Sequence, residues 1–503
     1  MEVSHTTDIL ESPAICHLRQ FVREHEQAWQ GGTPDFEQFE HALHEQVMAV
    51  ERELLTTELA RYDVQAEAIE VGGVAYHVVW VNTETYLTAV GEVQVERHLY
   101  RPAGHNAKSL CPLELRVGIV DGYWTPRAAR LGLFVMAQLP AGEAEMLFAE
   151  LETMRPSRST LDRLPRELSR HWEAKRDQWE TALRAQETVP ERAVSVALSV
   201  DGVMVAMKAK APERVAKQAE AGKHASGPAG KQEAGCATVS LYDAMGERMQ
   251  TVRYARMPES KKLTLQAQVQ GETQALFARH PDLRRVHLAD GAEPNWTLLA
   301  EVERDLGLSP STRLEIVDFY HACDHLKNGC DAVWGESTPR SQAEFARLKT
   351  LLTEEDGGAD CILHTFKYHA GRSTGHRQAR LRAELTYFRH QRPRMNYAEY
   401  LRQNLPIASG VMEAACKTLV TQRLKRSGMA WTQAGGQAIL TARSLIQSAR
   451  WSHAWPLLAA DFHQTVTVVR PLPEKQKQPA RAHMGRPIHQ SGADDYHALP
   501  LAV

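Results

Sequence analysis

The sequence predicts an α/β fold built on a mixed sheet with a helical insertion, preceded by a mainly helical N-terminal region that carries a small antiparallel sheet. Two observations predict it. Apolar residues alternate with a period of two in several short segments between 192 and 318. Between and after these segments they return at helical spacing, most extensively from 319 to about 455. The 503 residues are enough for roughly three domains of about 150 residues each.

The N-terminal region, residues 1–190, begins with helical spacing that continues to about residue 65. Residues 66–101 alternate instead and are rich in valine and tyrosine, with Gly72 and Gly73 between two such runs. This pattern indicates short antiparallel strands joined by a tight turn. Helical spacing returns over 126–186.

Residues 191–330 are expected to form the first part of the main sheet. In the first strand, 192–208, alternate residues up to Val200 share an apolar face, and Asp201 comes at the end of that buried run. Further strands are predicted at 236–243, 248–256, 283–290 and 312–318, with a helix before each of the last two. The order β-β-β-α-β-α-β is the layout of a ribonuclease H-like core.

Three further parts complete the predicted organisation. Residues 331–405 form a helical insertion, and residues 406–460 return to the core as helices. Residues 210–235, rich in alanine, glycine and lysine, are expected to form a solvated loop. The tail 461–503 contains several prolines, lysines and arginines and is expected to be disordered.

Composition limits the class of protein. The net charge of -3 at pH 7 gives no global indication of a nucleic-acid partner, so basic character has to be sought locally. Seven scattered cysteines without a CxxC pair indicate reduced thiols, and the acidic N-terminus lacks an apolar segment, so a cytoplasmic protein is expected. No run of about 18 apolar residues occurs, so no membrane association is expected.

Three carboxylates are the candidate catalytic and metal-binding residues. Asp201 and Asp290 each precede a glycine at the end of an apolar strand. Glu413 opens a helical segment in which no other acid occurs before Arg450. Phosphoryl transfer on DNA uses two divalent cations held by oxygen ligands, so the set predicts a site for two Mg²⁺ or Mn²⁺ ions. A glycine after each Asp would leave room for a metal or a phosphate. The alternative is that each Asp-Gly step forms a turn.

A second candidate group follows the last predicted strand. Asp318 ends that strand, and His321 and His325 lie close behind it. A zinc site would need three or four ligands at suitable spacing, which these residues meet only in part. The alternative is a hydrogen-bonded histidine near the strand end. We interpret Asp318 and His321 as supporting residues beside the three carboxylates.

Two basic clusters flank the candidate site and predict contacts with the DNA backbone. The helical segment after Glu413 and the segment near residue 390 supply the candidate DNA-binding residues Lys417, Arg423, Lys425, Arg426, Arg392 and Arg394. On the first segment Lys417, Thr421 and Lys425 follow helical spacing, opposite an apolar face. The alternative is a solvated helix face without a partner.

Four segments closely resemble bacterial insertion-sequence transposases, in the same order along the chain. They are SVDGVMV, LADGAEPNW, IVDFYHACDHL and the long block 387–431, which ends in IASGVMEAACKTLVTQRLKRSGMAW. The best match is the ISKra-type group, whose DDE catalytic domain is related to that of Mutator-like transposases. The resemblance covers roughly 190–455 and extends more weakly to 111–126.

The resemblance implies a ribonuclease H-like fold with a helical insertion, and magnesium-dependent cleavage and strand transfer at the ends of a mobile element. It makes Asp201, Asp290 and Glu413 the first, second and third carboxylates, and it matches Asp318 and His321 to a D-x-x-H motif whose histidine supports the site. The implied partners are the terminal repeats, target DNA and further copies of the chain. The N-terminal region would recognise the DNA ends. This region differs from the same region of the relatives, because it keeps only Cys111 of a cysteine-containing segment.

Two other functions remain open. The first is a ribonuclease H-like nuclease that cuts DNA without joining it. The second is a transposase relic that binds DNA without catalysis. The presence of all three acids argues against decay at the site.

Overall fold

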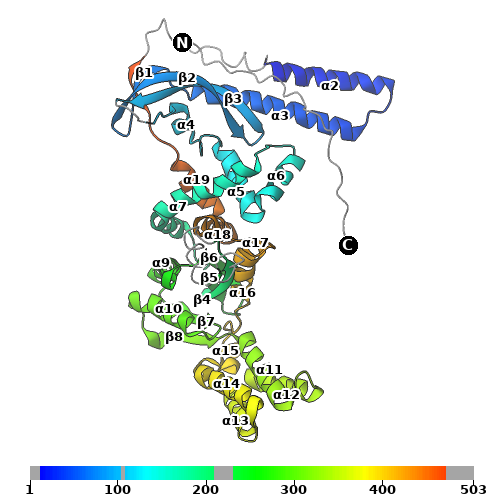
Figure 1. The fold of residues 1–503 in the computed structure, drawn as a ribbon, viewed down its shortest axis with the longest axis vertical. Helices are drawn as coiled ribbons and strands as arrows, with labels where there is room; N and C mark the ends of the chain where they lie inside the picture. The colour runs from blue at the N-terminus through cyan, green and yellow to red at the C-terminus, as the bar shows by residue number, and fades with distance from the viewer. Residues whose placement is uncertain (1–11, 104–107, 209–229, 472–503) are drawn as a thin grey trace, which may run out of the picture. The chain divides into compact units, whose positions relative to one another are not determined.

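The structure is a computed structural model that describes residues 12–103, 108–208 and 230–471. The described chain divides into two compact units. The first comprises residues up to 135, 141–167 and those from 458 onward, and the second comprises 136–140 and 168–457. Figure 1 shows their elements along the chain. The end of the N-terminal region predicted at 190 therefore differs from the boundary in the structure, because the later part of α7 (Arg158–Gln186) belongs to the second unit.

The first unit contains a helical hairpin, an antiparallel sheet and short helices, as the sequence predicts. The helices are α2 (Pro13–Gly31), α3 (Phe36–Arg61), α4 (Pro112–Val117), the start of α5 (Pro126–Gln138) and α6 (Ala141–Glu150). The sheet has the order β3-β2-β1-β9, with β1 (Ala66–Val71), β2 (Val74–Thr88), β3 (Gly91–Pro102) and β9 (Thr467–Pro471). Gly72 and Gly73 have φ of 58° and 78°, which the tight turn between β1 and β2 requires.

Strand β9 corrects the expectation of disorder at the start of the tail. Thr467–Pro471 pairs antiparallel with β1, with Val468 opposite Ile69. The rest of the tail, from residue 472, and most of the loop predicted at 210–235 lie outside the described residues. Residues 231–235 of that predicted loop instead belong to a strand.

The second unit is built on a five-stranded mixed sheet with the order β6-β5-β4-β7-β8. Its strands are β4 (Ala193–Ala206), β5 (Lys231–Asp243), β6 (Arg248–Arg256), β7 (Arg284–Ala289) and β8 (Arg313–Val317). The first three pair antiparallel, and β7 and β8 extend the sheet in parallel with β4. The strand and helix order predicted from the sequence is confirmed.

Both faces of the sheet are covered by helices, which explains the near-continuous apolar strands. Alternate β4 residues Val196, Leu198 and Val200 pack with α9 (Leu263–Arg279) and α10 (Glu293–Asp305). On the opposite face, Val205 and Cys236 pack with α16 (Gly410–Ala415), the π-helical segment η4 (Cys416–Thr421), α17 (Gln422–Leu424) and α18 (Gln433–Gln447). Each fully buried aliphatic side chain stabilises the unit by about 1.5–3 kcal/mol.

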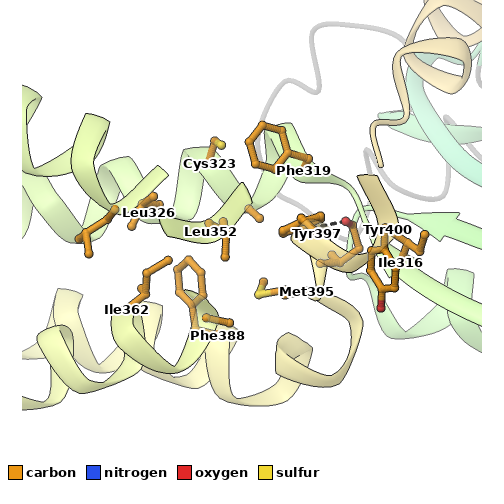
Figure 2. Packing of buried hydrophobic residues seen from close by; sticks show 14 of the residues in the cluster. Ile316, Phe319, Cys323, Leu326, Leu352, Ile362, Phe388, Met395, Tyr397 and Tyr400 are labelled. Carbon is orange, nitrogen blue, oxygen red and sulfur yellow. Dashed lines mark hydrogen bonds between the residues drawn. The ribbon is translucent and has the colours of Figure 1, made fainter. Parts of the chain in front are cut away.

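The predicted helical insertion is confirmed as helical and has a core of its own. It contains α11 (Phe319–Trp334), α12 (Pro339–Glu354), α13 (Gly358–Ala370), α14 (Gly375–Gln391) and α15 (Tyr397–Arg402). Figure 2 shows Ile362 and Phe388 packed in this core, which continues through Tyr397 to Ile316 of β8. The Tyr397 hydroxyl donates to the Val317 carbonyl at 2.9 Å, so the insertion is anchored on the sheet.

The remaining elements are the last α-helix and three short 3-10 helices. These are α19 (Trp451–Ala460), η1 (Ser260–Lys262), η2 (Pro310–Thr312) and η3 (Arg392–Arg394). Within the described parts of the chain, no helix combines the length and the apolar character needed to cross a membrane.

Candidate active site

Asp201 lies inside strand β4, and the expectation that it ends the strand is wrong. The strand continues to Ala206 and pairs with β5 throughout, with Asp201 opposite Cys236. The pairing of β4 with β7, by contrast, ends before Asp201, at Leu198 and His287. At Asp201 itself, β4 pairs only with β5.

Asp290 follows β7 directly, as predicted, and lies level with Asp201. Each of the two residues is three positions beyond the paired Leu198 and His287. Parallel strands lie about 4.8 Å apart, and residues at the same level point to the same face. Burial raises the pKa of Asp201, and the charge of Asp290 adds to that shift. The structure therefore brings these two carboxylates together.

The Asp290 carboxylate is held by the start of helix α10. Its Oδ1 accepts hydrogen bonds from the Ala292 backbone N–H at 3.0 Å and from Asn295 Nδ2 at 3.1 Å. Asn295 is buried, and its Oδ1 lies 3.4 Å from Lys262 Nζ. The positive charge of Lys262 also opposes the rise in the pKa of Asp201. A lysine thus lies near both acids.

The two glycines make room for protein side chains, which corrects their interpretation as space for a ligand. A Cβ on Gly202 would lie 1.7 Å from Glu233 Oε1. A Cβ on Gly291 would lie 3.3 Å from both Gln391 Nε2 and Tyr387 Cε2, and Gly291 also has φ of 99°. Gly202 is part of β4 and forms no turn, whereas Gly291 requires the left-handed conformation that favours glycine.

Glu413 lies in α16 with an exposed side chain, one helical turn from a residue that contacts Asp201. The Cys416 thiol donates to Asp201 Oδ2 at 3.7 Å. Side chains three residues apart on a helix lie about 5–6 Å from one another. A hydrogen bond with Cys236, followed by burial, raises the pKa of Cys416, which therefore stays protonated. Glu413 thus begins the helical segment whose Cys416 contacts Asp201.

The side chains do not form a ready-made metal centre. Over residues 12–103, 108–208 and 230–471, no group of three or more His, Cys, Asp or Glu side chains is arranged to hold a metal ion. This applies to the three candidate carboxylates and to the alternative zinc ligands Asp318, His321 and His325. The two aspartates are adjacent, and Glu413 does not complete a ligand set with them in this structure.

Asp318 is a buried connector between three parts of the second unit. It is 3% exposed, and its Oδ1 accepts from the His321 backbone N–H at 2.7 Å, which caps α11. Its Oδ2 accepts from the Ser409 backbone N–H, just before α16. Its own N–H donates to the Ala289 carbonyl at 2.8 Å, at the end of β7.

The histidines of this region have different surroundings. The His321 side chain is exposed, with its ring centroid 6.3 Å from that of His325. His325 Nδ1 lies 2.6 Å from Glu384 Oε2, and its ring stacks on Tyr387 with centroids 3.5 Å apart. The hydrogen-bonded alternative therefore describes His325.

Three of the six predicted DNA-binding residues are exposed and follow Glu413 in the sequence, namely Lys417, Lys425 and Arg426. Arg423 is instead 2% exposed and donates to the carbonyls of Met136 and Leu139, which corrects its assignment to the surface. Arg423 comes three and four positions after the buried Val420 and Leu419, so helical spacing puts it on the buried side of the segment.

The other basic cluster is also partly structural. Arg394 Nε donates to Glu315 Oε2 at 2.7 Å, and its guanidinium lies 4.2 Å from the centroid of the Trp296 ring. It therefore anchors the insertion and is not a free cation. Arg392 is exposed and lies 3.0 Å from Asp360 in a surface ion pair.

Four residues near the site were missed from the sequence, namely Lys262, Cys236, Tyr387 and Gln391. Lys262 and Cys236 carry no local signal, since their proximity depends on strand pairing and on a left-handed backbone at Lys262. Tyr387 and Gln391 lie at the start of the block that resembles the transposases, which could have drawn attention to them.

Comparisons with known proteins add little. No protein-family model matches the chain, and no curated protein matches it. Among solved structures, the chain is similar to one described as "Drosophila P element transposase strand transfer complex", with 11% sequence identity and a TM-score of 0.24. The match covers 68% of this chain and 82% of that chain. A similarity at this level supports no conclusion about the function of this chain.

Proposed function

We propose that this chain is a DDE transposase with a ribonuclease H-like catalytic core, which cleaves DNA at the ends of a mobile element and joins them to target DNA. The observation that carries the proposal is the position of Asp201 and Asp290, each three residues beyond the last pair of the adjacent parallel strands β4 and β7, with the charge of Asp290 acting on Asp201. The strand order β6-β5-β4-β7-β8 and the sequence resemblance of 387–431 support the same assignment.

The aspartate pair fits a divalent cation. Two carboxylates side by side repel each other, and the charge of Asp290 contributes to the raised pKa of Asp201. A Mg²⁺ or Mn²⁺ ion would relieve this repulsion and would be held by Asp201 and Asp290, with Glu413 as the further ligand. Two bound ions would supply an activated nucleophile and stabilise the leaving oxygen.

A few other residues would position the three carboxylates and the DNA. Cys416 donates to Asp201, and Asp318 binds the backbone that leads into the helix of Glu413. The exposed Lys417 and Lys425 would bind phosphates on the side of that helix away from its buried face.

The test uses the full chain with the DNA that flanks its gene, in Mg²⁺. Asp201→Ala, Asp290→Ala and Glu413→Ala should each abolish cleavage, while Asp305→Ala, an acid at the exposed end of α10, should retain it. DNA with pre-cleaved ends then separates the candidates. Joined product supports a transposase, hydrolysis alone supports a nuclease, and binding without either supports a relic. Full cleavage by any of the three variants would refute the carboxylate mechanism.

A further inference from the structure

A helix of the insertion packs directly on the loop that carries Asp290. Gln391 Nε2 of α14 donates to the Gly291 carbonyl at 2.9 Å. The ring edge of Tyr387, one turn earlier, would lie 3.3 Å from a Cβ on Gly291. Residues of the insertion therefore border the candidate catalytic carboxylate, although about a hundred positions separate them from it in the sequence.

The Tyr387 ring is held firmly in this position. It stacks on the His325 ring at a centroid distance of 3.5 Å and an interplanar angle of 15°. His325 is in turn fixed by Glu384, with 2.6 Å between Nδ1 and Oε2. Because a tyrosine side chain has only two rotatable torsions before its hydroxyl, the position of that hydroxyl is fixed as well.

The Tyr387 hydroxyl is buried and lacks a hydrogen-bond partner in the part of the chain that the structure describes. Most buried polar atoms have such a partner, because an unsatisfied one costs free energy. The ionisable groups that act on this hydroxyl are Asp318, Asp290, Glu384 and Asp324, all of them carboxyl groups. Burial and these charges raise the pKa of the Tyr387 hydroxyl, so it keeps its proton at neutral pH and can donate a hydrogen bond to an acceptor.

We propose, on the basis of the function proposed above, that Tyr387 contacts the substrate and that its hydroxyl donates a hydrogen bond to a phosphate oxygen of the DNA strand bound beside Asp290. A phosphate oxygen accepts without donating, and its negative charge strengthens the bond. Helix α14 suits a polyanion, since it contains four arginines and one acid. The insertion would then supply a substrate contact in addition to its own core.

Tyr387→Phe tests the proposal, because it removes the hydroxyl and keeps the stacked ring. The binding probe is a fluorescent duplex of the flanking DNA in Ca²⁺, and single-turnover cleavage is measured in Mg²⁺. We expect binding or cleavage to weaken about tenfold, equivalent to about 1.4 kcal/mol. Thermal stability should stay equal or rise, because an unsatisfied buried hydroxyl is lost. Tyr368→Phe, on the exposed side of α13, is the matched control.

The outcomes separate this inference from the proposed function. If the wild-type chain binds and cleaves DNA and Tyr387→Phe does so within twofold, only the role of Tyr387 is wrong. A lower melting temperature for Tyr387→Phe would also overturn it, since the hydroxyl would then have a partner within the protein. If the wild-type chain neither binds nor cleaves the DNA, the proposed function and this inference both fail.

Discussion

Replacing Arg450 by methionine is expected to destabilise the second unit by about 3–5 kcal/mol, because it removes the nearest cation of the buried Glu272 carboxylate. Arg450 is 3% exposed and binds two acids, Glu272 at 2.8 Å and Glu187 at 2.5 Å. Its Nη1 also donates to the Tyr254 hydroxyl at 2.7 Å. Glu272 is 5% exposed, so its charge would stay largely out of water. A domain is stable by only about 5–15 kcal/mol in total, so the loss would be large.

Urea unfolding followed by circular dichroism measures the change. Arg304→Met is the control, since that arginine is 69% exposed and pairs only at the surface, and it should cost less than about 1 kcal/mol. Adding Glu272→Gln to Arg450→Met should recover part of the stability by removing a buried charge that would be left with only Arg184, at 3.5 Å. A loss below about 1 kcal/mol for Arg450→Met, or no recovery in the double variant, would refute the reasoning.

The dependence on pH provides a second check of the same network. Burial alone would raise the pKa of Glu272, but the charge and hydrogen bonds of Arg450, with smaller effects of Tyr254 and Arg184, together outweigh it and bring the pKa below its usual value. A lowered pKa stabilises the fold above the unfolded pKa and loses that effect as pH falls through the folded pKa. The difference between the wild type and Arg450→Met should therefore shrink below about pH 4.5.

Four other substitutions have distinct expected effects. Burial raises the pKa of Glu180 to about 7, so the stability that its protonated form provides is lost as pH rises through that value. In thermal melts at pH 8, Glu180→Gln should therefore be more stable than the wild type, by up to about 3 kcal/mol. Below about pH 4.5 the two proteins should be equally stable. Gly291→Ala should lower stability by about 1–3 kcal/mol in urea unfolding, because alanine disfavours φ of 99° and its Cβ would crowd Gln391. Arg423→Ala should lower thermal stability, whereas Lys425→Ala should keep it and reduce the salt dependence of DNA binding. Equal effects of the last two variants would contradict their assignment to core and surface.

The sheet was predictable because alternation is a local property of the sequence. The positions of the five strands along the chain follow from apolar periodicity and from Gly246, which has φ of 77° at the turn between β5 and β6. The position of Asp201 within its strand was not predictable in this way. It depends on the pairing of β4 with β5, which continues past Asp201 to Ala206.

The two misassigned arginines show the same limit. Arg394 looks like a member of a basic cluster, but its partner Glu315 lies 79 residues away in the sequence. Arg423 belongs to a run of basic residues in the sequence, but the carbonyls that it binds, those of Met136 and Leu139, come from a distant part of the chain. The sequence shows which residues are charged, but it does not show which charged groups pair with each other in the tertiary fold.

Asp318 explains how Glu413 could keep a defined position after a long insertion. The insertion begins and ends at one place, since the Phe319 N–H donates to the Ile407 carbonyl at 2.9 Å. Both oxygens of Asp318 are used there, one by His321 at the start of α11 and the other by Ser409 before α16. Because Asp318 also binds the Ala289 carbonyl at the end of β7, the helix of Glu413 is tied to the strand that leads to Asp290. Asp318 therefore holds the two ends of the insertion together, and with them the backbone that leads into the helix of Glu413.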